Sequence, residues 1–118
     1  MHEGKKVMNS IPEEIMAYII QVLQDICYGE ITLIIQDRRI IQIERSEKLH
    51  FEQCRLCLSK HMFSNSEIEH VKGQITAYFQ HLAYGKIVIV VKNTRITGIE
   101  RTEKQRFKEL DNMNFKTM

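Results

Sequence analysis

The sequence predicts an α+β fold, in which two αββ repeats form a four-stranded antiparallel sheet with both helices packed on one face. Three observations predict this fold. Residues 28–51 match residues 84–107 without a gap, with 11 of 24 positions identical. Each copy has apolar residues at helical spacing followed by two strand-like segments. The 118 residues include only 5 Gly and 1 Pro, which favours long elements joined by short turns. The repeat also predicts a pseudo-twofold axis.

A helix is expected at the start of each copy. Residues 10–13 and 66–69 both read Ser-x-x-Glu, the pattern of a capping box, and Pro12 falls where the first helical turn needs no N–H donor. Gly29 and Gly85 are expected to end the helices in a left-handed conformation. The apolar positions of the two helices are Ile11, Ile15, Ile19, Val22, Leu23 and Ile26, and Ile68, Val71, Ile75, Tyr78, Phe79 and Leu82.

Two strands joined by a polar turn follow each glycine. Asp37 and Asn93 stand at the centres of the turns, where their side chains are favoured. Ile40 and Ile43 differ in parity, so a two-residue turn and a three-residue turn predict different registers, and the sequence leaves both open. The four strands are expected at residues 31–35, 39–45, 87–91 and 95–101.

One pseudo-symmetric domain is expected, because a single helix with a hairpin is only marginally stable alone. The expected segments are an N-terminal tail at 1–9, a first αββ repeat at 10–51, a helical connector at 52–65, a second αββ repeat at 66–107 and a C-terminal tail at 108–118.

The second face of the sheet is not cleanly polar. Ile34, Val88 and Val90 are apolar at positions that would face away from the helices. A sheet with one solvated face alternates more regularly than this, so something else is expected to cover the face. We expect self-association, through this face or through the terminal segments.

Residues 28–48 carry the combination Tyr-Gly…Ile-Glu-Arg-x-Glu-Lys, which is repeated at 84–104. This combination resembles the YezD-like family of short bacterial proteins, which contain one domain of unknown function. In that family the turn often reads Asp-Gly, whereas here Arg38 and Thr94 replace the glycine. The resemblance implies a small bacterial, cytoplasmic protein and implies no known activity.

The same four charges end the second hairpin strand of both copies. The sequence Glu-Arg-x-Glu-Lys occurs at 44–48 and at 100–104. One interpretation is a set of exposed ion pairs, each contributing about 0–1 kcal/mol. The other is a paired surface for an anion, a nucleic-acid backbone or a protein partner. Its candidate binding residues are Arg45, Lys48, Arg101 and Lys104.

Zinc-type ligands occur in and just before the connector, namely His50, Cys54, Cys57 and His61. Residues 49–63 read as a helix, on which the four side chains would form a stripe about 16 Å long, too long for one tetrahedral ion. Cys54 and Cys57 align with Leu110 and Met113, which indicates that they fill a core, and Cys27 aligns with Ala83 in the same way. No metal or other cofactor is therefore expected, and these four residues are only weak metal candidates.

Charge and motifs narrow the function classes. The net charge is +2, although residues 1–59 carry −2 and residues 60–118 carry +4. The chain has no run of 18 apolar residues and no hydrophobic signal-peptide core, which predicts a cytoplasmic protein that does not enter a membrane. No nucleotide-binding, metalloprotease or nucleophile-elbow motif is present.

The sequence predicts a non-enzymatic interaction or assembly module. The alternatives are a nucleic-acid-binding regulator that uses the repeated Arg/Lys pairs, and a metal or redox protein that uses Cys54 and Cys57.

Overall fold

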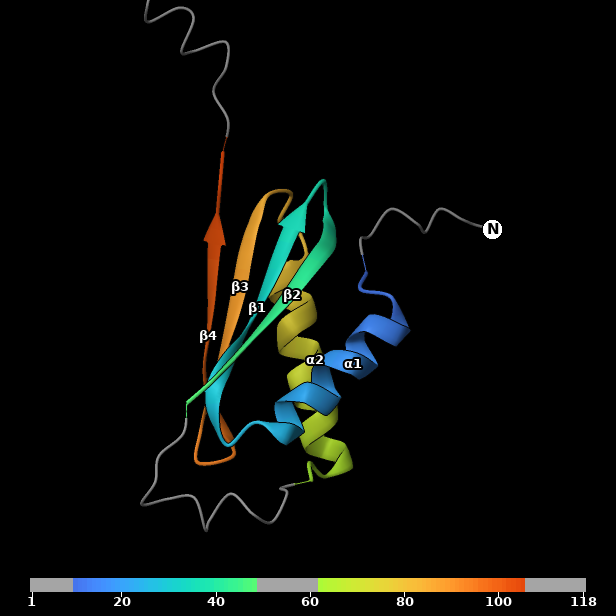
Figure 1. The fold of residues 1–118 in the computed structure, drawn as a ribbon. Helices are drawn as coiled ribbons and strands as arrows, with labels where there is room; N and C mark the ends of the chain where they lie inside the picture. Colours follow the sequence, from blue (N-terminus) through green and yellow to red (C-terminus); the bar gives the residue numbers. More distant parts are fainter. Residues whose placement is uncertain (1–9, 49–61, 106–118) are drawn as a thin grey trace, which may run out of the picture.

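The computed structural model describes residues 10–48 and 62–105, which form two helices and four strands (Figure 1). In chain order the elements are α1 (Glu13–Asp25), β1 (Tyr28–Gln36), β2 (Arg39–Glu47), α2 (Asn65–Phe79), β3 (Gly85–Lys92) and β4 (Arg95–Glu103).

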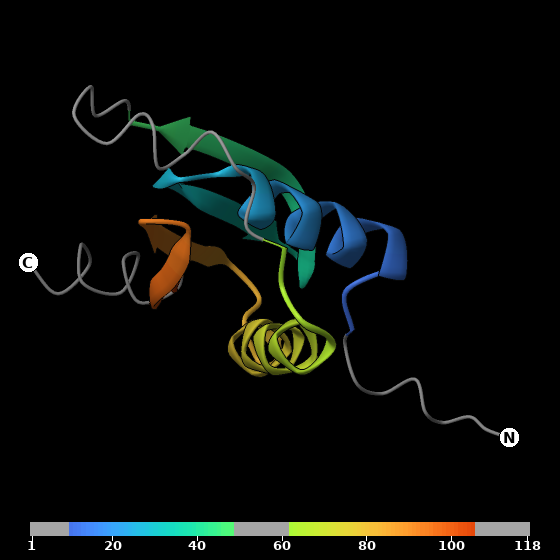
Figure 2. The ribbon, with the colours of Figure 1, turned by 90° about the horizontal axis from the view of Figure 1, so that it is seen from below.

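The four strands form one antiparallel sheet in the order β2-β1-β3-β4. Both helices lie on the same side of this sheet, α1 and α2 next to each other (Figures 1 and 2). The two hairpins join through β1 and β3, and the register centres on the pair Thr32 and Val88, which are equivalent residues of the two repeats. The predicted α+β class, with helices on one face and pseudo-twofold symmetry, is confirmed.

Alternate residues of the two central strands form the core beneath the helices. The apolar side chains that face the helices lose nearly all contact with water, which is the main favourable contribution to folding. Those of β1 and β3 are Ile31, Leu33, Ile35, Ile87, Ile89 and Val91, and the largest from the helical side are Ile19, Leu23, Ile26, Ile75, Phe79 and Leu82.

The hairpin turns contain two residues each, and every one of these residues has a positive φ. The values are 54° and 63° at Asp37 and Arg38, and 53° and 63° at Asn93 and Thr94. Two positive φ values define the type I′ turn, whose twist matches that of the flanking strands. Of the two registers that the sequence left open, the structure has the one with the two-residue turn.

A β-bulge in each edge strand explains the change of parity. Ile34 pairs with Gln42 while Ile35 pairs with Ile40, so Ile41 is the extra residue of β2. The bulge allows Ile40 and Ile43 to pack against the same core although their parities differ. Strand β4 repeats this arrangement, with Thr97 as the extra residue.

The turn of the second hairpin predicts a stabilising substitution. Thr94 is β-branched and has a φ of 63°, a conformation that disfavours such residues. We expect Thr94→Gly to raise the free energy of unfolding by about 0.5–1 kcal/mol, the relief of strain exceeding the extra entropy of glycine in the unfolded chain. Thermal unfolding followed by circular dichroism measures this change. Asn93→Gly is the control, because asparagine tolerates positive φ, and equal effects of the two changes would contradict the account.

The helix starts differ from the sequence prediction. Helix α2 begins at Asn65, and its N-cap is Ser64. The Ser64 hydroxyl accepts the Glu67 backbone N–H, and the Glu67 carboxylate accepts the Ser64 N–H. The predicted cap at Ser66 is therefore wrong by two residues. Helix α1 begins after Pro12, which is its N-cap and provides no side-chain bond, so the predicted cap at Ser10 is also wrong.

Gly29 and Gly85 do not end the helices as predicted, because both helices end several residues earlier. The two glycines lie at the starts of β1 and β3 instead, where the backbone of the neighbouring edge strand comes very close. A Cβ atom would lie 2.1 Å from the Ser46 carbonyl oxygen at Gly29, and 2.0 Å from the Thr102 oxygen at Gly85. Glycine is required here by close backbone approach.

Reciprocal backbone bonds tie the two repeats together. The Arg38 N–H in the first turn donates to the Ala83 carbonyl, at 3.0 Å, just before β3. The Thr94 N–H in the second turn donates to the Cys27 carbonyl, at 2.9 Å, just before β1. Each hairpin tip therefore holds the chain entering the other hairpin. The predicted limits of the repeats and tails stay predictions.

Candidate interaction surface

The sheet face opposite the helices, called here the open face, carries an apolar strip on its two central strands. It consists of Thr32 and Ile34 on β1 and Val88 and Val90 on β3, all half-buried. Thr32 lies directly opposite Val88, so the strip crosses the junction of the two repeats. No element of the described residues covers this face (Figures 1 and 2).

Charged side chains surround the strip. Glu30 pairs with Val90, and Lys86 pairs with Ile34, so these two charges stand at opposite ends of the strip. Glu44 and Glu100 pair with Thr32 and Val88 from the two edge strands. Directly paired residues share a face, which places all four charges on the open face. An apolar centre with a charged border is typical of a protein-binding surface.

A pocket of about 550 Å³ lies at the Glu30 end of the open face. Lys48 and Lys92 line it together with Glu30 and Val90, so it combines two cations, a carboxylate and an apolar wall.

The predicted anion-binding residues are not brought together. Arg45 pairs with Ile31 and Arg101 pairs with Ile87, which places both arginines on the face that carries the helices. They lie on the two opposite edge strands, and these strands are about 14 Å apart because neighbouring strands are about 4.8 Å apart. The two sets of charges are therefore separate, and anion binding by either set stays a prediction.

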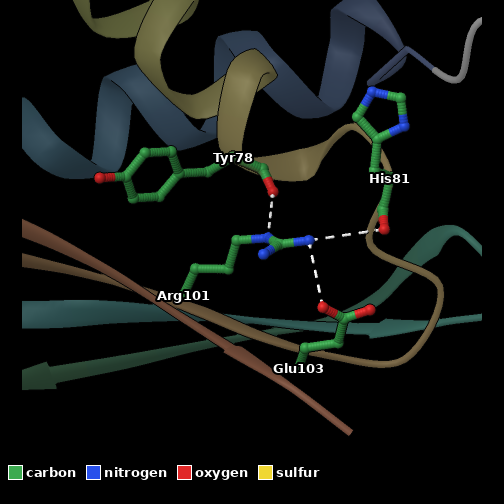
Figure 3. A network of polar contacts seen from close by, with 4 residues as sticks. All are labelled: Tyr78, His81, Arg101 and Glu103. Carbon is green, nitrogen blue, oxygen red and sulfur yellow. Dashed lines mark hydrogen bonds and ion pairs between the residues drawn. The ribbon is translucent and has the colours of Figure 1, made fainter. Parts of the chain in front are cut away.

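Arg101 is engaged by the end of helix α2 (Figure 3). Its Nε atom donates to the Tyr78 carbonyl at 3.1 Å and its Nη2 atom donates to the His81 carbonyl at 3.4 Å. Nη2 is also 3.5 Å from the Glu103 carboxylate. Carbonyls at a helix C-terminus lack helical donors, and a nearby cation also favours the negative end of the helix dipole. The arginine therefore holds α2 against β4.

This contact predicts a loss of stability in the variant Arg101→Ala. We expect the free energy of unfolding to fall by about 1 kcal/mol, because the Tyr78 and His81 carbonyls lose a charged donor. Urea unfolding followed by circular dichroism measures it. Arg95→Ala removes an exposed arginine from the same strand and is expected to change stability by less than about 0.5 kcal/mol. A loss no larger in Arg101→Ala than in Arg95→Ala would show that the helix contact contributes nothing.

The equivalent residue of the first repeat has a different partner. Arg45 forms a hydrogen bond and an ion pair with Glu47, two residues further along β2. Exposed pairs of this kind contribute little. The Lys48 backbone N–H donates to the Tyr28 carbonyl, and the Lys104 N–H donates to the Tyr84 carbonyl, both at 2.8 Å. These bonds join the two strands of each hairpin at the end away from its turn.

The weak metal candidates His50, Cys54, Cys57 and His61 lie outside the described residues. Within residues 10–48 and 62–105, no group of three or more His, Cys, Asp or Glu side chains is placed to hold a metal ion. Cys27 is half-buried and disulfide-bonded. The prediction that Cys27 only fills space is therefore wrong.

The sequence predicted the apolar part of the open face but not its charges. Glu30 and Lys86 are equivalent residues of the two repeats, at the offset of 56 that defines them. The repeat together with the alternation of strand residues would have placed them on one face at either end of the strip. The two copies carry opposite charges at this position, so it does not belong to the charge pattern that the repeats share.

Comparison with known proteins identifies a family but no activity. The family described as "uncharacterized small protein (DUF2292)" matches the chain twice, at residues 15–51 and 72–107. No curated protein and no solved structure matches the chain. Among the described residues, no helix has the length and apolar character needed to cross a membrane. The narrower resemblance to YezD-like proteins stays a prediction. The two matches cover more than half of the sequence, and the chain therefore belongs to this family of uncharacterised small proteins, whose domain it carries twice in tandem.

Proposed function

We propose that this chain is a small non-enzymatic interaction module that binds a protein partner through the open face of its sheet. The observation that carries the proposal is the apolar strip of Thr32, Ile34, Val88 and Val90 on the face that lacks helices. Removing apolar surface from water is the main driving force of protein association. A sheet with one covered face offers a flat, preformed surface for it.

The edges of the sheet favour binding at the open face over the addition of a partner's strand to β2 or β4. Both edge strands contain a bulge, at Ile41 in β2 and at Thr97 in β4. A bulge interrupts the row of backbone donors and acceptors that an added strand would need, and proteins use this device to protect their edges.

The alternative of a nucleic-acid-binding regulator has less support. Arg101 donates to two backbone carbonyls, and Arg45 is paired with Glu47. The open face itself carries Glu44 and Glu100, which would repel phosphates. The use of the repeated Arg/Lys pairs in nucleic-acid binding therefore stays a prediction.

Photocrosslinking in the source cell tests the proposal. A photocrosslinking amino acid in place of Thr32, at the centre of the open face, is expected to yield a discrete crosslinked species. The same group in place of Tyr18, which is 52% exposed on α1, is the control for random collisions. The absence of a species specific to position 32 would overturn the proposal.

A further inference from the structure

We propose that the partner of the open face is a second copy of this chain, packed face to face so that each Glu30 lies opposite Lys86 of the other copy. This inference rests on the proposed function, since it names the partner of the same surface. Its starting point is an asymmetry between the repeats: equivalent positions hold a carboxylate on β1 and an ammonium on β3.

The positions of the two charges make this surface complementary to itself. Glu30 lies two residues before Thr32, Lys86 lies two residues before Val88, and Thr32 pairs with Val88. Because β1 and β3 are antiparallel, the line from Glu30 to Lys86 crosses the sheet diagonally through this central pair. A twofold axis in the plane of the interface, perpendicular to that line, exchanges the two positions. Each copy then presents Glu30 to Lys86 of the other.

The same axis gives an ordinary packing of two sheets. With strands about 4.8 Å apart and a rise of about 3.3 Å per residue, the line from Glu30 to Lys86 is inclined by about 20° to the strands. The strands of the two copies then cross at about 40°, near the roughly 30° at which aligned sheets pack. The same axis brings Thr32 and Val88 of the two copies together at the centre of the layer between the sheets. The apolar strips cross there, and Ile34 and Val90 of each copy lie over the edge strands of the other.

The size of the face sets the expected strength of the pairing. Four strands at a spacing of about 4.8 Å and about eight residues in length give about 500 Å² per copy. The total of about 1,000 Å² is at the lower limit of specific interfaces, so a dissociation constant in the micromolar range is expected. Glu44 and Glu100 lie on the edge strands level with the central pair, so the same axis brings each of them near its own counterpart in the other copy. Their like charges oppose the pairing and keep it at the weak end of this range.

Sedimentation equilibrium of the purified full chain tests the pairing, from about 1 to 500 µM at low salt. The wild-type chain is expected to form dimers. Glu30→Lys and Lys86→Glu are each expected to raise the dissociation constant about tenfold or more, because each places like charges opposite one another. The double variant that exchanges the two residues is expected to return within about threefold of wild type. Glu69→Lys, on the exposed side of α2, is the control with the same change in charge as Glu30→Lys.

Three outcomes would overturn the inference. The first is a wild-type chain that stays monomeric throughout the concentration range. The second is a dimer that Glu30→Lys weakens no more than Glu69→Lys does. The third is a double variant that dimerises no better than the single ones, although circular dichroism shows it folded. If the chain is monomeric while position 32 still crosslinks to a different protein in cells, this inference fails and the proposed function stands. If the wild-type chain is monomeric and removal of residues 106–118 exposes the open face, the occupant of that face is this segment and not a second copy.

Discussion

The variant Gly85→Ala is expected to lose about 3 kcal/mol of unfolding free energy, one of the two largest effects of a single substitution that we expect in this protein. An added Cβ would lie 2.0 Å from the Thr102 carbonyl oxygen and 3.0 Å from its carbon. These are backbone atoms of β4, so no side chain can turn away to relieve the clash. Strand β4 must instead move away from β3, which weakens the ladder between them. The backbone at Gly85 also has a φ of 156°, which alanine rarely adopts.

Urea unfolding followed by circular dichroism measures this loss, and Gly73 provides the matched control. Gly73 lies within α2, and a Cβ added there meets nothing within 4 Å. Gly73→Ala is therefore expected to raise the free energy of unfolding by about 0.5–1 kcal/mol, since alanine is favoured in a helix interior. If Gly85→Ala lowers the free energy of unfolding while Gly73→Ala raises it, the loss at Gly85 comes from the close approach of β4. The intrinsic difference between glycine and alanine cannot explain both changes. A Gly85→Ala chain as stable as wild type would contradict the predicted contact with β4.

The variant Phe79→Ala is expected to lose about 3–5 kcal/mol of unfolding free energy. Phe79 is the last residue of α2 and is only 2% exposed, within the core between helices and sheet. Removal of its ring takes away buried apolar surface and leaves a cavity, because the surrounding core relaxes only in part.

The neighbouring tyrosine is the control for this substitution. Tyr78 precedes Phe79 in the same helix turn and is 39% exposed. Tyr78→Ala leaves its own backbone carbonyl in place for Arg101 and is expected to cost less than about 1 kcal/mol. Chemical unfolding of the two variants at equal concentration compares them. Similar losses would show that the core at this end of α2 is not packed as described.

The fold was predictable because its patterns are strong and occur twice. The period of the helices and the alternation in β1 and β3 both follow from which side chains are buried, and the repeat supplied the symmetry. The register was less accessible. Parity placed Ile40 and Ile43 on opposite faces, and only the bulge at Ile41, where the two strands are paired in space, brings them to one core.

Several local features were predicted incorrectly, either because two residues fitted the same rule or because the feature depends on a distant segment. Ser64 and Ser66 are each followed by a glutamate three residues later, and alignment with the first repeat favoured the wrong one. Gly29 follows a helical pattern closely enough to suggest a cap, while its actual requirement comes from the Ser46 carbonyl on another strand. The role of Arg101 likewise depends on where α2 ends relative to β4. Such contacts between distant segments leave no local pattern.

Pairing of two chains through the open face is the central claim, and isotope-filtered nuclear Overhauser spectroscopy tests it most directly. A mixture of methyl-labelled and unlabelled chains, at a concentration where dimers form, reports only contacts between copies. The account predicts cross-peaks to the methyl groups of Ile34, Val88 and Val90. Ile41, which is 53% exposed on the edge strand, is expected to give far weaker ones. Cross-peaks restricted to Ile41 or to the helices, or none at all, would contradict the claim.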